Sequence, residues 1–247
     1  MAEKLKLVLK IVRSQLLLKA AIFAGLLFWV KISNFSVLPV FLFLLTNTIL
    51  YFRGRGQNNS ETIGSSVILL IISLFGVSMI GHLQFLIPAI ILYSVIFYLI
   101  LGIKDLVFVQ RGHLNYFKNI LLFYSIFLTY FLSDKYDLFF IKYSLVFVFT
   151  FLLVYEWLFW SEKSFVKRRR IIAMVFSLLV LQLTWGASLL PLGFVNSATL
   201  MTVLIYIMFD FCLHHFQGTI SKELILKNSA VLALSAFFIF IFTNWHI

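Results

Sequence analysis

The chain has 247 residues, of which 62% are hydrophobic and only 12% are charged, and its mean hydropathy is +1.05. These values lie far outside the composition of soluble globular domains, so they exclude a soluble protein and predict that a lipid bilayer supplies much of the solvent. The formal net charge of +11 could indicate nucleic-acid binding, but the placement of the basic residues along the chain argues against that function.

Nine apolar runs, each bounded by charged or turn-forming residues, follow one another along the chain. A spanning helix needs roughly 20 residues, so about nine spans with short connections use nearly the whole length. The predicted fold is therefore all-α, a single polytopic transmembrane helical bundle over residues 1–247. The predicted spans are 15–31, 36–52, 62–80, 85–103, 119–133, 138–160, 171–190, 196–213 and 229–245.

Two of these spans are weaker than the others. Lys19 interrupts the run 15–31, and the run 119–133 is short for a helix that crosses a bilayer. If one of the two lies along the membrane interface, the count becomes eight instead of nine.

Two segments outside the spans are predicted to lie on the membrane surface. Residues 1–14 form a basic amphipathic segment within the same domain, because several of their Lys and Arg residues share one helical face. The alternative is that these charges are solvated and only set the orientation of the chain. Residues 104–118 alternate apolar and polar side chains, and Gly112 would permit a turn there.

The distribution of Lys and Arg predicts the orientation in the membrane. Short cytoplasmic loops of membrane proteins collect basic residues. With the N-terminus in the cytoplasm, all but three of the 20 basic residues fall on the cytoplasmic side, the exceptions being Lys31, Lys135 and Lys142. The net charge therefore reflects topology and not nucleic-acid binding. The expected partners are the lipid bilayer and anionic lipid headgroups at the inner face.

Ionisable side chains inside a membrane are expensive, so each is a candidate for function. Glu156 and Asp210 lie about one turn from the predicted inner ends of their spans, where their charges can reach the interface. Gln182 is the only strongly polar side chain near the middle of a span. Gln182 and Glu156 are therefore candidate substrate contacts, and an interhelical hydrogen bond is the alternative role for Gln182.

The clearest group of candidate catalytic residues is Asp210, His214 and His215, with His113 predicted at the same membrane face. Asp210 and His214 are four residues apart and share one helical face, a spacing compatible with a shared metal or with a carboxylate that orients an imidazole. Catalytic zinc needs three protein ligands. Candidates for a third ligand are His113, Glu156 and Asp105. Nothing in the sequence forces them together, so no metal is predicted. The alternatives are a structural carboxylate–imidazole pair and a pocket for a phosphate or headgroup.

No phosphate-binding glycine loop, HExxH helix or nucleophile elbow occurs in the sequence, so no cofactor is predicted. The favoured hypothesis is a non-enzymatic scaffold or a subunit of a membrane assembly, which packs against a protein partner or a second copy. The alternatives are a small permease or channel, and a membrane-embedded enzyme that acts at the inner leaflet.

Two short motifs in the C-terminal third carry a resemblance. They are the segment from Trp185 to Phe194, WGASLLPLGF, and the segment from His214 to Gly218, HHFQG. With the helix between them they resemble a group of uncharacterised multi-pass membrane proteins from bacteria with reduced genomes. The resemblance implies a location in the bacterial inner membrane and implies no particular activity.

Overall fold

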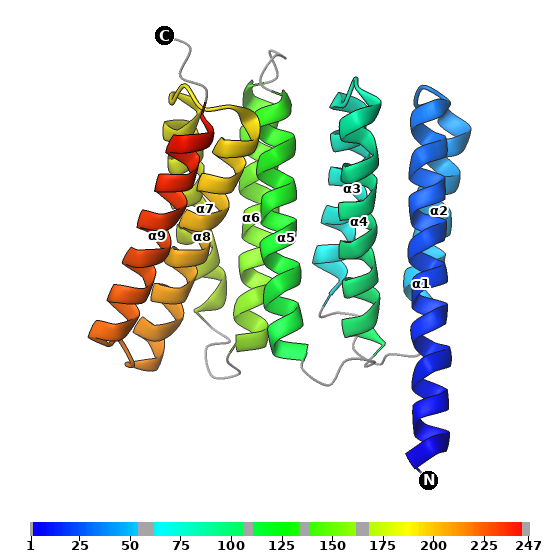
Figure 1. The fold of residues 1–247 in the computed structure, drawn as a ribbon, viewed down its shortest axis with the longest axis horizontal. Coiled ribbons are helices and arrows are strands. Elements are labelled where there is room, and N and C mark those ends of the chain that lie inside the picture. Colours follow the sequence, from blue (N-terminus) through cyan, green and yellow to red (C-terminus); the bar gives the residue numbers. More distant parts are fainter. Residues whose placement is uncertain (1, 54–61, 106–110, 134–138, 162–167, 244–247) are drawn as a thin grey trace. The chain divides into compact units, whose positions relative to one another are not determined.

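The computed structural model describes residues 2–53, 62–105, 111–133, 139–161 and 168–243. Within these ranges the secondary structure consists of nine α-helices and no strands (Figure 1). The helices are α1 (Ala2–Ile32), α2 (Val37–Phe52), α3 (Ile63–Met79), α4 (Leu83–Lys104), α5 (Arg111–Leu132), α6 (Phe139–Ser161), α7 (Arg169–Ser188), α8 (Phe194–Gln217) and α9 (Lys222–Phe242). The prediction of an all-α helical bundle is confirmed for the described residues, and each predicted span overlaps one helix.

Five of the helices contain a stretch that is long and apolar enough to cross a membrane. These stretches are Ser14–Ile32, Gln84–Lys104, Phe140–Trp160, Arg169–Ser188 and Phe194–Gln217. The helices α2 and α3 are also apolar but have only 16 and 17 residues. The described helices are therefore those of a membrane-embedded protein by length and composition.

The start of α5 corrects one prediction. The helix begins at Arg111, so residues 111–118 are helical and Gly112 lies inside the helix, not at a turn. Lys118 is fully buried, and its ammonium donates a hydrogen bond of 2.8 Å to the hydroxyl of Ser65 on α3. A polar stretch can continue a helix when its polar side chains find partners inside the protein, and hydropathy alone does not reveal those partners.

The chain divides into two compact units, Met1–Leu122 and Phe123–Ile247. The first unit contains α1 to α4 and the beginning of α5, and the second contains the rest of α5 and α6 to α9. The single transmembrane domain over the whole chain, including the basic segment 1–14, stays a prediction.

In the first unit, α1 packs against α2, α3 and α4. The buried residues of α1 recur at alternating spacings of four and three, which places them on one helical face: Leu16, Ala20, Phe23, Leu27 and Val30. The ring of Phe23 stacks on Phe97 of α4 with 4.6 Å between centroids, and it also contacts Phe43 of α2 at 5.3 Å. This aromatic contact forms the centre of the unit.

Two lysines of the first unit, Lys19 and Lys104, are held by neighbouring groups. Lys19, which interrupts the first predicted span, forms an ion pair with Asp105 just beyond the end of α4, with 3.7 Å between the charged atoms. The adjacent Lys104 is buried, and its ammonium donates to the backbone carbonyl of Tyr51 and lies 4.1 Å from the centroid of the Tyr51 ring. The Tyr51 hydroxyl bonds to Thr62 at 2.8 Å. These contacts explain how basic residues are accommodated beside apolar helices.

In the second unit, α7 packs between α6 and α8, and α8 also packs against α9. The ring of Trp157 on α6 stacks on Phe209 of α8, with 3.4 Å between ring centroids and 15° between ring planes. Phe209 also meets Phe176 of α7 edge-on at 6.3 Å. All three rings are buried. This aromatic core joins α6, α7 and α8 and fixes the part of α8 that carries Asp210.

Candidate functional site

The best-defined group of polar side chains in the second unit lies where α8 ends and α9 begins. Gly218 ends α8 in the left-handed conformation, with φ of 66°, which an L-residue with a side chain adopts only at a cost. Its N–H and that of Thr219 donate to the last carbonyls of α8. Ser221 then caps α9 by accepting a hydrogen bond of 3.2 Å from the Leu224 N–H. These local signals make α8 and α9 a helical hairpin.

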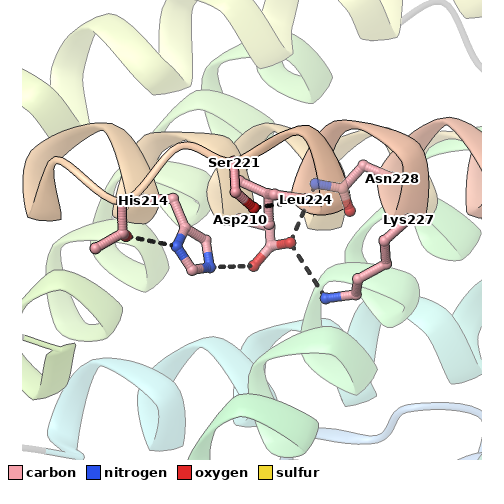
Figure 2. Close-up of polar contacts among 7 residues, drawn as sticks. Asp210, His214, Ser221, Leu224, Lys227 and Asn228 are labelled. Carbon is pink, nitrogen blue, oxygen red and sulfur yellow. Dashed lines mark hydrogen bonds and ion pairs between the residues drawn. The ribbon is translucent and has the colours of Figure 1, made fainter.

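The carboxylate of Asp210 lies at the centre of this group (Figure 2). One of its oxygens lies 3.7 Å from Nε2 of His214. The other oxygen accepts a hydrogen bond of 3.1 Å from the side-chain amide of Asn228 and lies 3.4 Å from the ammonium of Lys227. The Asp210 side chain is only 12% exposed. We call Asp210, His214, Thr219, Lys227 and Asn228 the hairpin cluster.

His214 connects the carboxylate to the link between the two helices. Its Nδ1 lies 2.8 Å from the Thr219 hydroxyl, and its Nε2 faces Asp210. The spacing of four residues predicts a shared face for Asp210 and His214, and the two side chains do meet. Both ring nitrogens therefore face groups of the hairpin itself.

Lys227 approaches the cluster from the first turns of α9, with its ammonium 5.9 Å from the centroid of the Tyr206 ring. Desolvation lowers the pKa of Lys227, but the hydrogen bond with the Tyr206 hydroxyl and the negative charge of Asp210 together outweigh it. The pKa of Lys227 is therefore raised above its ordinary value. The lysine stays positively charged beside the carboxylate, and the pair is close to electrically balanced.

Sequence reasoning does not identify three members of the cluster, Thr219, Lys227 and Asn228. The sequence assigns Lys227 only a role in setting the topology and does not single out Thr219 or Asn228, although the Asn228 side chain is buried. For Lys227 and Asn228 the available signal is that both are polar and directly precede the long apolar run of α9. Antiparallel packing of a short hairpin brings such residues opposite the last turns of α8.

The other candidate residues lie elsewhere. His215 is exposed and lines an apolar groove, described below, instead of the hairpin cluster. Glu156 is buried on α6, and Gln182 is exposed on the surface of α7. His113 is exposed on the first turn of α5, in the first unit. The structure thus joins Asp210 with His214 and adds two residues from α9.

The groups around Asp210 belong to the hairpin itself. Three side chains surround its carboxylate: Asn228 and Lys227 contact one oxygen, and His214 faces the other. Asp210 and His214 offer at most two ligands for a metal, and in the described part of the chain no three His, Cys, Asp or Glu side chains gather. The cluster links α8 to α9.

A second feature of this unit is an apolar groove of about 630 Å³ between α7 and α8, which we call the α7–α8 groove. It is lined by Ile171, Ile172, Val175, Phe176, Leu179, Met208, Phe211, Cys212, His215, Phe216 and Ile220. His215, at one end, is the most polar of these side chains, so the groove is suited to an apolar occupant.

Comparison of the chain with models of known protein families, with curated proteins and with solved structures finds no match.

Proposed function

We propose that the chain is a multi-pass protein of the bacterial inner membrane, with nine spans and a cytoplasmic N-terminus. Nine described helices in the order that the hydropathy predicts support this topology. With the N-terminus inside, the helix ends that carry Arg53, Lys104, Arg168 and Lys222 all lie on the cytoplasmic side, in agreement with the preference of such loops for basic residues.

Within that membrane we propose a non-enzymatic role, as a subunit or scaffold that packs against a protein partner. The observation that carries this proposal is the exposure of Gln182 on α7. Its side chain lies about 9 Å from the end of the helix at Ser188, inside a stretch apolar enough to span a membrane. The neighbours on this face, Leu178 and Trp185, are also exposed.

An amide cannot find hydrogen-bond partners among lipid tails. A buried polar group without a partner costs about 1–3 kcal/mol, whereas polar side chains between packed membrane helices bond across the interface. The exposed Gln182 is therefore best explained by a polar group of another protein that covers this face. A different membrane protein and a second copy of this chain both satisfy the argument.

The hairpin cluster supports the same role, because its carboxylate and imidazole bind each other and their neighbours. The permease alternative needs a cavity that reaches Gln182. The α7–α8 groove ends at Leu179, about one turn away from that residue, and its lining is apolar.

Site-specific photocrosslinking in native membranes tests the proposal. A photoreactive phenylalanine analogue replaces Gln182, and the matched control carries it at Leu226, which is 74% exposed on α9. We expect a discrete adduct of higher mass at position 182 and none at position 226. Two differently tagged copies distinguish a second copy from another protein. Adducts with lipid only, or an intramolecular product only, would contradict the proposed partner.

A further inference from the structure

The α7–α8 groove runs along the helices for a distance close to the depth of one leaflet. Along α7 it extends from Ile171 to Leu179 and along α8 from Met208 to Phe216, and each stretch rises about 12 Å. One leaflet of the hydrocarbon core is about 15 Å deep, half of the usual thickness. The groove therefore covers most of the depth of one leaflet.

Positive charge gathers at one end of the groove. Arg168 and Arg170 are exposed at the start of α7, and Arg170 directly precedes Ile171 in the lining. His215 is exposed at the same end of the lining, opposite on α8. The first turn of α7 adds backbone N–H groups without intrahelical partners, which favour an anion. Arg169 is buried, with its guanidinium 5.1 Å from the Phe159 ring of α6, so it faces away from this end.

The acidic side chains of the described second unit do not neutralise this charge. Asp210 is held in the hairpin cluster and Glu156 is buried on α6. Glu223 is exposed on the first turn of α9, next to the exposed Lys222. The two exposed arginines thus present a positive surface directly beside an apolar groove, and His215 adds a polar side chain at the same end.

We propose that the α7–α8 groove binds one anionic phospholipid of the inner leaflet. An acyl chain lies along the groove, and the phosphate contacts Arg168, Arg170 and His215. A second copy of the chain fits this position poorly, because it would bring the basic inner end of another helix to a surface that is already positive. The inference rests on the proposed membrane insertion and adds to it a defined site for the anionic lipid that is expected at the inner face.

Native mass spectrometry of the purified full chain in detergent tests the site. The protein is titrated with phosphatidylglycerol or with phosphatidylcholine of the same acyl chains. We expect phosphatidylglycerol to bind at least about tenfold more tightly, and the double variant R168Q/R170Q to lose roughly 10- to 30-fold of that affinity. The matched control R53Q/K222Q removes two exposed basic residues from the same predicted membrane face. It should stay within about twofold of the wild type.

A second pair of variants tests the groove itself. Val175→Trp fills the lining and should weaken binding of both lipids, whereas Met174→Trp, which is equally exposed but outside the lining, should not. Equal affinity for the two lipids would overturn the proposal, as would equal losses in R168Q/R170Q and R53Q/K222Q. A mass of two chains in place of a lipid adduct would assign the groove to a second copy. A failed crosslink at Gln182 with intact lipid binding would contradict only the proposed partner.

Discussion

Asp210 supplies the negative charge around which the α8–α9 hairpin closes. A carboxylate that is mostly removed from solvent is tolerated only when it is paired and hydrogen-bonded. Here His214, Lys227 and Asn228 provide those contacts from both helices. Lys227 is half exposed and can also reach water, so the pair avoids much of the cost of a fully buried ion pair.

Replacing Asp210 with alanine should therefore lower the free energy of unfolding. The buried Asn228 amide loses its acceptor, and hydrogen bonds to charged groups contribute about 1.5–3 kcal/mol. We expect unfolding by sodium dodecyl sulfate in mixed micelles to shift to lower detergent fractions. Glu223→Ala removes an exposed carboxylate from the first turn of α9 and should shift the transition less, because such a charge contributes only about 0.3–1 kcal/mol. An unchanged transition in Asp210→Ala would show that the cluster does not hold the helices together.

The raised pKa of Lys227 predicts a pH dependence. A lysine whose pKa is higher in the folded than in the unfolded protein stabilises the fold fully below its unfolded pKa, near 10.5, and that contribution is lost as the pH rises through the folded value. The stability difference between wild type and Lys227→Gln should therefore be constant from pH 7 to 9 and shrink above about pH 10.5. Lys222→Gln is the control. A difference that grows with pH would contradict the assigned contacts.

At the scale of the helices, the first turns of α9 set how this helix packs against α8. Much of its surface is exposed and apolar, and the buried side chains Leu224, Asn228 and Ile239 form a narrow stripe against α8. The link to α8 at Gly218 and the cap at Ser221 set the direction in which α9 leaves the turn. The hairpin cluster then fixes the position of the two helices along each other.

Gly218→Ala should destabilise this hairpin by roughly 1–2 kcal/mol, because a Cβ is strained in the left-handed conformation. An added Cβ meets no atom within 4 Å there, so the loss of stability would come from the strained backbone conformation and not from a steric clash. Gly186→Ala on α7, where the Cβ also meets nothing within 4 Å, is the control and should be neutral or stabilising. The same detergent titration measures both variants. Equal changes in the stability of the two variants would mean that the left-handed conformation at Gly218 does not determine the effect of the substitution.

At the scale of the whole molecule, the sequence predicts the helices well because length and hydropathy decide them. Each predicted span overlaps a described helix, and the main error, the start of α5, comes from buried polar residues such as Lys118. The pair of Asp210 and His214 follows from helical spacing alone. Lys227, Asn228 and the α7–α8 groove depend on which faces of two helices meet, and periodicity within one helix does not specify that choice.

The topology places both the partner face and the lipid site, so it is the central claim to test. Single cysteines are introduced at Gly81, Leu190 and Gln217, all exposed, in a variant whose only native cysteine is removed by Cys212→Ala. Cells with an intact plasma membrane are then treated with a membrane-impermeant maleimide. We expect labelling at positions 81 and 190 and none at position 217. Labelling at only one of positions 81 and 190 would mean that a helix between them does not cross, and labelling at 217 alone would reverse the orientation.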